Sequence, residues 1–124
     1  MRRLPLFTTL IAFAAADAMR SPAQAEPVAE VVTFKLVAGT DPQAFVAAAR
    51  GIEPYLRGTG AVISRTLSVD ADGIWTDHIV WTSLQAAKDA ADALMAQPEA
   101  APMMTVIAAD SVTLRHAPIL LTMD

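Results

Sequence analysis

The sequence predicts an α+β domain in which two helices alternate with four strands, in the order strand, helix, strand, strand, helix, strand. Four stretches are rich in β-branched and aromatic residues, which are typical of strands. Two other stretches repeat apolar residues at helical spacing, and a short segment containing Asp and Gly separates the second strand from the third. The expected strands are residues 28–37, 61–69, 74–81 and a segment within residues 111–123.

The first helix is expected directly after the strand at residues 28–37. Asp41 offers a side-chain oxygen to the unpaired amides of a first helical turn, and Pro42 follows where no N–H is needed. Pro54 lacks an amide hydrogen and clashes with the preceding turn, so the helix should kink or end there. The apolar stripe of this helix contains Phe45, Ala48, Ala49, Ile52 and Leu56.

The second half of the chain should begin with a hairpin. Residues 70–73 (Asp-Ala-Asp-Gly) are typical of the turn that joins two antiparallel strands. After the third strand, Thr82 and Gln85 have the spacing of a capping box, with Thr82 as the helix cap. Pro118 restricts the last strand to a sheet edge or to the end of its pairing. The second helical stripe contains Leu84, Ala87, Ala91, Leu94 and Met95.

This order is the ferredoxin-like βαββαβ arrangement, a four-stranded antiparallel sheet with two helices on one face. We expect the first and third strands to be central, and both carry apolar side chains on both faces. Because large exposed apolar patches are rare on monomers, the sequence predicts a homodimer in which the sheet of a second copy covers the open face. The alternative is a monomer whose open face is made partly polar by Thr33, Lys35, Thr76 and His78.

Residues 1–25 predict a secretory signal peptide. Arg2 and Arg3 precede an uncharged apolar stretch at residues 4–16, and Ala23-Gln24-Ala25 places small residues where a signal peptidase reads them. As a helix, the apolar stretch would span roughly 20 Å, which is short of the roughly 30 Å hydrocarbon core and disfavours a membrane anchor. We therefore expect residues 26–124 to be a single periplasmic or secreted domain without a membrane attachment.

The charges and the absence of cysteine exclude several classes of function. The chain has 9 Lys and Arg against 13 Asp and Glu, so it lacks the basic footprint of a nucleic-acid-binding protein. With no Cys, it has no disulfide, thiolate metal site or thiol nucleophile. Two His without an aligned carboxylate are a weak metal-binding set. We expect neither a metal nor a cofactor, and no nucleic-acid partner.

Two segments resemble the dimeric α+β barrel proteins, notably the antibiotic-biosynthesis monooxygenase and stress-responsive barrel groups. One is Val31-Val32-Thr33-Phe34-Lys35-Leu36 followed by Gly39-Thr40-Asp41, and the other is residues 78–87, a strand that ends in Trp and runs into a capped helix. The resemblance covers nearly all of residues 26–124. It implies a dimer whose sheets form a barrel, with a ligand cavity in each subunit. Members include cofactor-free monooxygenases, heme-degrading enzymes and isomerases, so the fold leaves the function open.

The sequence departs from two of these groups. Heme-degrading members place a Trp and a His on and after the second helix, but residues 83–104 contain neither. Stress-responsive barrels often carry His-Pro-x-His at the end of that helix, where this chain has residues 97–100, Gln-Pro-Glu-Ala. Both differences argue against the chemistry of those groups.

His78 is the candidate catalytic residue, as a proton shuttle or heme ligand, because histidine changes its charge near neutral pH. The alternative is a hydrogen-bonded histidine at the interface. Its neighbour Asp77 points to the opposite face of the strand and cannot orient it directly. His116, beside Arg115, could approach His78 because the third and fourth strands both flank the first strand, or it could be an edge or surface residue.

The candidate ligand-binding residues could line an apolar cavity between the helices and the sheet, or could be ordinary core. An anionic ligand could be held by Arg65, Lys35 and Arg115, which could equally be solvated. Three functions remain open: a module that binds a small, mostly apolar molecule, a cofactor-independent monooxygenase-like enzyme acting on a small aromatic substrate, and a structural protein without a ligand. The cavity candidates are Trp75, Trp81, Tyr55, Met95, Met103 and Met104.

Overall fold

The computed structural model describes residues 26–124, and the predicted signal peptide lies outside the described residues. The strands are β1 (Val28–Phe34), β2 (Val62–Val69), β3 (Trp75–Trp81) and β4 (Thr113–Pro118). The helices are α3 (Pro42–Arg50), α4 (Glu53–Gly58), α5 (Leu84–Leu94) and α6 (Ala101–Met104), with short 3₁₀ turns η1 (Pro98–Ala100) and η2 (Ala109–Ser111). None of the helices within residues 26–124 is long and apolar enough to span a membrane.

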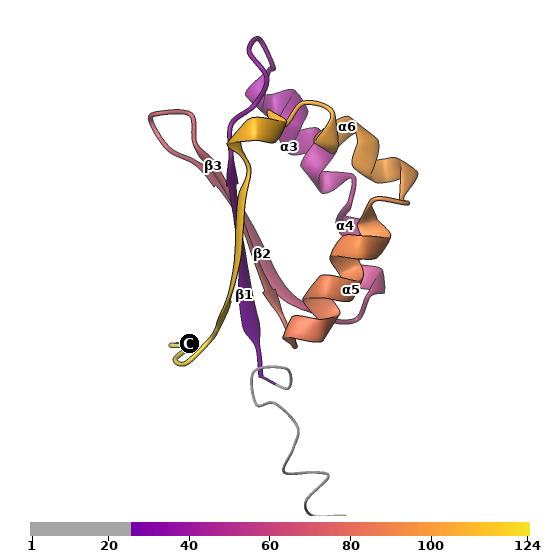
Figure 1. Ribbon diagram of the computed structural model, residues 1–124, viewed down its shortest axis with the longest axis vertical. Helices are drawn as coiled ribbons and strands as arrows, with labels where there is room; N and C mark the ends of the chain where they lie inside the picture. Colours follow the sequence, from indigo (N-terminus) through magenta and orange to yellow (C-terminus); the bar gives the residue numbers. More distant parts are fainter. Residues whose placement is uncertain (1–25) are drawn as a thin grey trace, which may run out of the picture.

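The four strands form one antiparallel sheet in the order β2-β3-β1-β4. The prediction that the first and third strands are central and paired is therefore confirmed. Figure 1 shows the helices of residues 26–124 on one side of this sheet, which we call the covered face, while the other side, the open face, carries none of them. This is the predicted ferredoxin-like α+β fold, and it places alternate residues of each strand on opposite faces.

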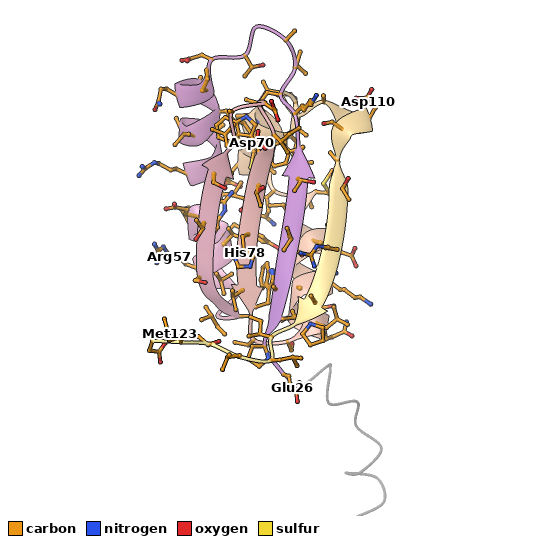
Figure 2. The ribbon with its side chains drawn as sticks, turned by 90° about the vertical axis from the view of Figure 1, so that its left-hand side faces the viewer. Glu26, Arg57, Asp70, His78, Asp110 and Met123 are labelled. Carbon is orange, nitrogen blue, oxygen red and sulfur yellow. The ribbon has the colours of Figure 1, made fainter. Side chains whose placement is uncertain are left out.

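The first predicted helix is divided in two, as Pro54 predicts. The Asp41 side chain accepts a hydrogen bond from the amide of Gln43, and Pro42 is the first residue of α3. That helix ends at Arg50, and α4 begins at Glu53 with the proline in its first turn. Both helices lie on the side of the sheet where β2 is the edge strand (Figure 2).

The predicted capping box of the second helix is wrong by one residue. Ser83, not Thr82, is the cap, because its hydroxyl accepts a hydrogen bond from the amide of Ala86. The amide of Thr82 instead donates to the carbonyl of Ala61, which continues the pairing between the ends of β2 and β3. The side chain of Gln85 bonds Asp89 one turn later and does not return to the cap.

The first and last strands are shorter than predicted. After β1, Leu36 forms an isolated antiparallel bridge with Ile107, and the Lys35 amide donates to the Ser111 hydroxyl. These bonds take the end of the predicted first strand away from the sheet and toward the loop that precedes β4. The hairpin between β2 and β3 is as predicted: Asp70 accepts bonds from two turn amides and Gly73 adopts a positive φ of 78°.

The hydrophobic core lies between the covered face and the helices. Three of its aromatic rings are in contact: Phe45 of α3 packs edge-on against Phe34, with ring centroids 5.5 Å apart, and against Trp75, at 4.9 Å. Edge-to-face packing is the favoured geometry for such pairs. The buried apolar residues are Val28, Phe34, Phe45, Ala49, Ile52, Leu56, Trp75, Ile79, Trp81, Ala87, Ala90, Ala100 and Met103.

Candidate functional site

A half-open cleft of about 730 Å³ lies between α3, α4 and β2, on the covered side of the sheet. It lies where the broken helix passes the edge strand of the sheet. Its wall from the sheet comes from β2 and from Trp75 at the start of β3, and its helical wall includes Val46, Leu56 and the polar side chains of Arg50, Glu53 and Arg57. Figure 2 shows Arg57 beside the edge of the sheet formed by β2.

Arg65 is the cationic side chain of β2 that lines this cleft, and it is held on three sides. Its guanidinium makes a bidentate pair with Asp77 of β3, with Nε–Oδ1 at 3.0 Å and Nη2–Oδ2 at 2.7 Å. Nη1 donates to the carbonyl of Ala49 in α3 at 2.8 Å. Both side chains of the pair are only 12% exposed. The pair thus connects two strands and a helix, and it fixes one wall of the cleft.

A second buried carboxylate lies on the same face of the sheet, in β1. Glu30 Oε2 is 2.8 Å from Nε2 of His116 in β4. Sequence reasoning missed this pair and assumed that neither histidine had a carboxylate partner. The signal was the position of Glu30 between Val28 and Val32 on the apolar face of a central strand, since a buried acid requires a partner. Neither residue lines the cleft.

His78 lies on the open face, where Figure 2 shows it near the middle of the sheet. It pairs with Val31 of β1, whereas His116 pairs with Glu30. Consecutive residues of a strand point to opposite faces, so the two histidines are on opposite sides of the sheet. The prediction that they could approach each other is therefore wrong. The prediction that Asp77 cannot orient His78 is confirmed, because Asp77 pairs with Arg65 on the covered face.

The six predicted cavity residues do not gather at one place. Trp75 lines the cleft. Trp81 is buried in the core, and its Nε1 is the buried side-chain polar atom without a hydrogen-bond partner among residues 26–124. Met103 is buried and contacts Arg65, with Nη2–Sδ at 3.9 Å. Met95 and Met104 are exposed.

Tyr55 packs against the second helix and does not face the cleft. Its hydroxyl donates to the carbonyl of Ala90 in α5 at 2.6 Å, and burial raises the pKa of the phenol above its ordinary value. It borders a shallow hollow between α4 and α5 that is lined mainly by glycine and alanine. The bond therefore joins the two halves of the helical layer.

The predicted anion-binding set is also separated by the fold. Arg65 is on the covered face in the ion pair with Asp77. Arg115 is exposed and pairs with Val31 in the sheet register, on the open face, and Lys35 is exposed beyond the end of β1. Within residues 26–124 there is no group of three or more His, Asp or Glu side chains that could hold a metal ion.

Comparisons with known proteins agree with this fold. No protein-family profile and no curated protein sequence matches the chain. SnoaB, a cofactor-independent oxygenase from Streptomyces nogalater, has a similar structure, with a TM-score of 0.56, 19% identity, and coverage of 81% of this chain and 97% of that chain. A putative antibiotic biosynthesis monooxygenase from Chloroflexus aurantiacus has a TM-score of 0.59, 13% identity, and coverage of 79% and 97%.

A hydroxynitrile lyase from Passiflora edulis is similar to the same degree, with a TM-score of 0.56, 11% identity, and coverage of 81% and 99%. These three proteins share an architecture with the chain but carry different activities in their names, and identity this low establishes the fold alone. The chain therefore has the ferredoxin-like α+β fold of the antibiotic-biosynthesis monooxygenase-like structures.

Proposed function

We propose that this chain is an exported homodimeric protein that binds a small, mostly apolar molecule in the cleft between α3, α4 and β2. The observation that carries the proposal is the cleft itself. Its volume of about 730 Å³ falls in the range of small-molecule sites, roughly 300–1,000 Å³. Val46, Leu67 and Val69 supply apolar surface beside the largely buried Trp75, and polar side chains of both walls supply the rest of the lining.

The cleft is held open by bonds that do not require a ligand. Arg65 connects β2 to Asp77 of β3 and to the carbonyl of Ala49 in α3, so the strand wall and the helix wall are fixed relative to each other. A preformed site does not pay an ordering cost when a ligand binds. This arrangement favours a binding role over a purely structural role for the domain.

The homodimer is supported by the apolar groups on and beside the open face. Residues 119–124 cross the end of the sheet from β4 toward β2 (Figure 2). Leu120 and Leu121 are each 89% exposed and Met123 is 93% exposed. Together with Ile63 and Val80, this segment borders a hollow of about 300 Å³. A second copy that packs on the open face would cover these groups. Light scattering after size-exclusion chromatography should give twice the monomer mass, and a monomer at micromolar concentration would contradict the dimer.

Export is a separate part of the proposal, and it is supported by the sequence of residues 1–25. N-terminal sequencing of the protein purified from the periplasm or medium of its host should begin at Glu26. A protein that retains Met1 and stays in the cytoplasm would contradict export without affecting the binding proposal.

Ligand binding can be tested with the two tryptophans of the chain. Trp75 lines the cleft, whereas Trp81 is buried elsewhere and its Nε1 has no hydrogen-bond partner within residues 26–124, so a phenylalanine there loses no such bond. In Trp81→Phe, the neutral fluorophore N-phenylnaphthylamine should quench the remaining Trp75 emission with saturation. In the matched variant Trp75→Phe, quenching of Trp81 should be much weaker. Equal quenching in both variants, or no saturable binding, would contradict a ligand site in the cleft.

The second candidate function is a cofactor-independent oxygenase that acts on a small aromatic substrate. The similarity of the fold to SnoaB favours it. Its support is weaker because, among residues 26–124, no histidine lines the cleft and Glu53 is the one carboxylate that does. Oxygen consumption in the presence of small phenols, lost in Glu53→Gln but kept in His78→Ala, would favour an enzyme over a binding module. No consumption would leave binding as the function.

A further inference from the structure

The basic residues of this acidic chain are concentrated at one place. Residues 26–124 contain six Lys and Arg against twelve Asp and Glu. Three of those six basic residues, Arg50, Arg57 and Arg65, line the cleft, but only one of the twelve acidic residues, Glu53, does so. A cleft that carries the opposite charge to the rest of the surface focuses the field and attracts ligands of the matching sign.

The three arginines differ in how many of their guanidinium N–H groups are free to bind a ligand. Arg65 is neutralised by Asp77, and its contacts with Asp77, Ala49 and Met103 use four of the five guanidinium hydrogens. Within residues 26–124, neither Arg50 nor Arg57 takes part in an ion pair or a side-chain hydrogen bond. Both are exposed at the helical wall of the cleft, on consecutive helices. The guanidinium N–H groups of both residues are therefore available to a ligand, and Glu53 is the single acidic residue among the described residues that lines the cleft with them.

We propose that the ligand of this cleft is a small apolar carboxylate, with its anionic group bound by Arg50 and Arg57 and its apolar body against Trp75 and Leu67. This inference rests on the proposed binding function and adds the chemical class of the ligand. A planar guanidinium matches the two oxygens of a carboxylate and binds them with paired hydrogen bonds. The apolar half of the cleft, formed by Val46, Leu56, Val62, Leu67 and Trp75, is suited to an uncharged body and not to a second charge.

The inference can be tested with two fluorophores that differ by one anionic group. N-phenylnaphthylamine is neutral, and anilinonaphthalene sulfonate has the same aromatic frame with an added sulfonate, which stands in for the carboxylate. In the Trp81→Phe background, with Trp75 as the reporter, the anionic probe should bind about tenfold more tightly than the neutral probe. Its advantage should fall as salt is raised, because exposed guanidinium groups are screened.

Substitution separates the two arginines from general charge effects. The double variant Arg50→Gln and Arg57→Gln should lose the anionic preference, about tenfold in affinity, while binding the neutral probe as before. The matched control is Lys88→Gln, which removes a positive charge from the exposed side of α5, away from the cleft. It should change both affinities by less than about twofold.

The possible outcomes distinguish this inference from the proposed function. If both probes bind equally and the arginine variants change nothing, the anionic class is overturned and the apolar binding site stands. If Lys88→Gln weakens the anionic probe as much as the arginine variants do, the preference is a property of net charge and the inference is overturned. If neither probe quenches Trp75, the binding function itself fails. Competition by a benzoate or a short fatty acid with the anionic probe would extend the support from sulfonate to carboxylate.

Discussion

The two faces of the sheet differ in whether their polar side chains have partners within the chain. On the covered face, the two acids of the central strands are buried and each has a partner, Asp77 with Arg65 and Glu30 with His116. On the open face, no polar side chain of a strand residue among residues 26–124 makes a hydrogen bond to another protein group; these residues are Thr33, Ser64, Thr66, Ser68, Thr76, His78, Thr113 and Arg115. The buried acids of the covered face thus find their partners within one chain, whereas the open face is left with donors and acceptors for water or a partner.

This difference shows that residue type alone does not identify a site in a sheet. A histidine in a central strand has the chemistry of a catalytic group, but His78 faces away from the cleft, whereas Arg65 of β2 lines it. Whether a side chain contributes to a site depends on the face of the sheet on which it lies and on the neighbouring strand. Substitutions on the covered face should therefore change stability, and those on the open face should change association.

The largest effect is expected from separating the Arg65–Asp77 pair. Arg65→Met leaves the buried Asp77 carboxylate without its partner and should lower the free energy of unfolding by about 3–5 kcal/mol. Urea denaturation measures this change. The double variant Arg65→Met and Asp77→Leu removes both charges, and replacement of a buried pair by apolar residues is often neutral. It should recover most of the loss, and a double variant as unstable as the single one would contradict a role for the unpaired charge.

Separating the Glu30–His116 pair should also lower stability, but by less, because His116 is in an edge strand and its side chain is 19% exposed, against 12% for each member of the Arg65–Asp77 pair. His116→Leu leaves the Glu30 carboxylate unsatisfied, which should cost about 1–3 kcal/mol of unfolding free energy. His116→Gln keeps a donor near the carboxylate and should recover part of this loss. If the leucine and glutamine variants are equally stable, the hydrogen bond does not contribute and only the packing of the ring matters.

The elements of the fold could be predicted because their signals are local. Asp41 and Pro42 mark the start of α3, Pro54 separates α4 from it, and residues 70–73 mark the hairpin, each within a few residues of the structure it determines. The helix cap was displaced by one residue because the Thr82 amide pairs with the carbonyl of Ala61. That bond depends on Ala61, which lies 21 residues earlier at the start of β2 and is not part of the local pattern.

The site could not be predicted in the same way, because its contacts depend on the register between strands. Glu30 and His116 are 86 residues apart and meet only because β4 pairs with β1 in a particular alignment. The same register places His78 opposite Val31 and so on the other face. A sequence pattern shows which residues share a face within one strand, but a shift of one residue in pairing exchanges the faces. The cleft also depends on the break between α3 and α4. Pro54 predicts that break, but the sequence does not predict the angle between the two helices.

A smaller effect is expected from the bond between Tyr55 and the carbonyl of Ala90, which joins α4 to α5. Tyr55→Phe should lower the free energy of unfolding by about 1 kcal/mol at neutral pH. Burial raises the pKa of this phenol above its ordinary value of 10.0. The folded chain therefore holds the neutral form while the unfolded chain ionises, so this stabilisation is complete below pH 10.0 and declines as the pH rises toward the folded pKa.

The difference in stability between the native protein and Tyr55→Phe should consequently shrink above pH 10.0. Denaturation of both proteins in parallel cancels the contributions of lysine and arginine, which the two share. Because Tyr55 is the one tyrosine of the chain, the absorbance of its phenolate reports this group alone. Ionisation of the folded protein at the pH of free tyrosine would contradict the burial of the hydroxyl.

The smallest effect on the folded monomer is expected from His78→Ala, and it tests the separation of the two faces most directly. His78 makes no side-chain hydrogen bond within residues 26–124 and does not line the cleft. A substitution away from buried networks usually changes unfolding by less than about 0.5 kcal/mol. Binding of N-phenylnaphthylamine should stay within about twofold, since the sheet lies between this residue and the cleft. The mass from light scattering is the sensitive measurement, because loss of the dimer with unchanged probe binding would assign the open face to association. Loss of probe binding with an intact dimer would instead bring His78 back into the ligand site and remove the distinction between the two faces.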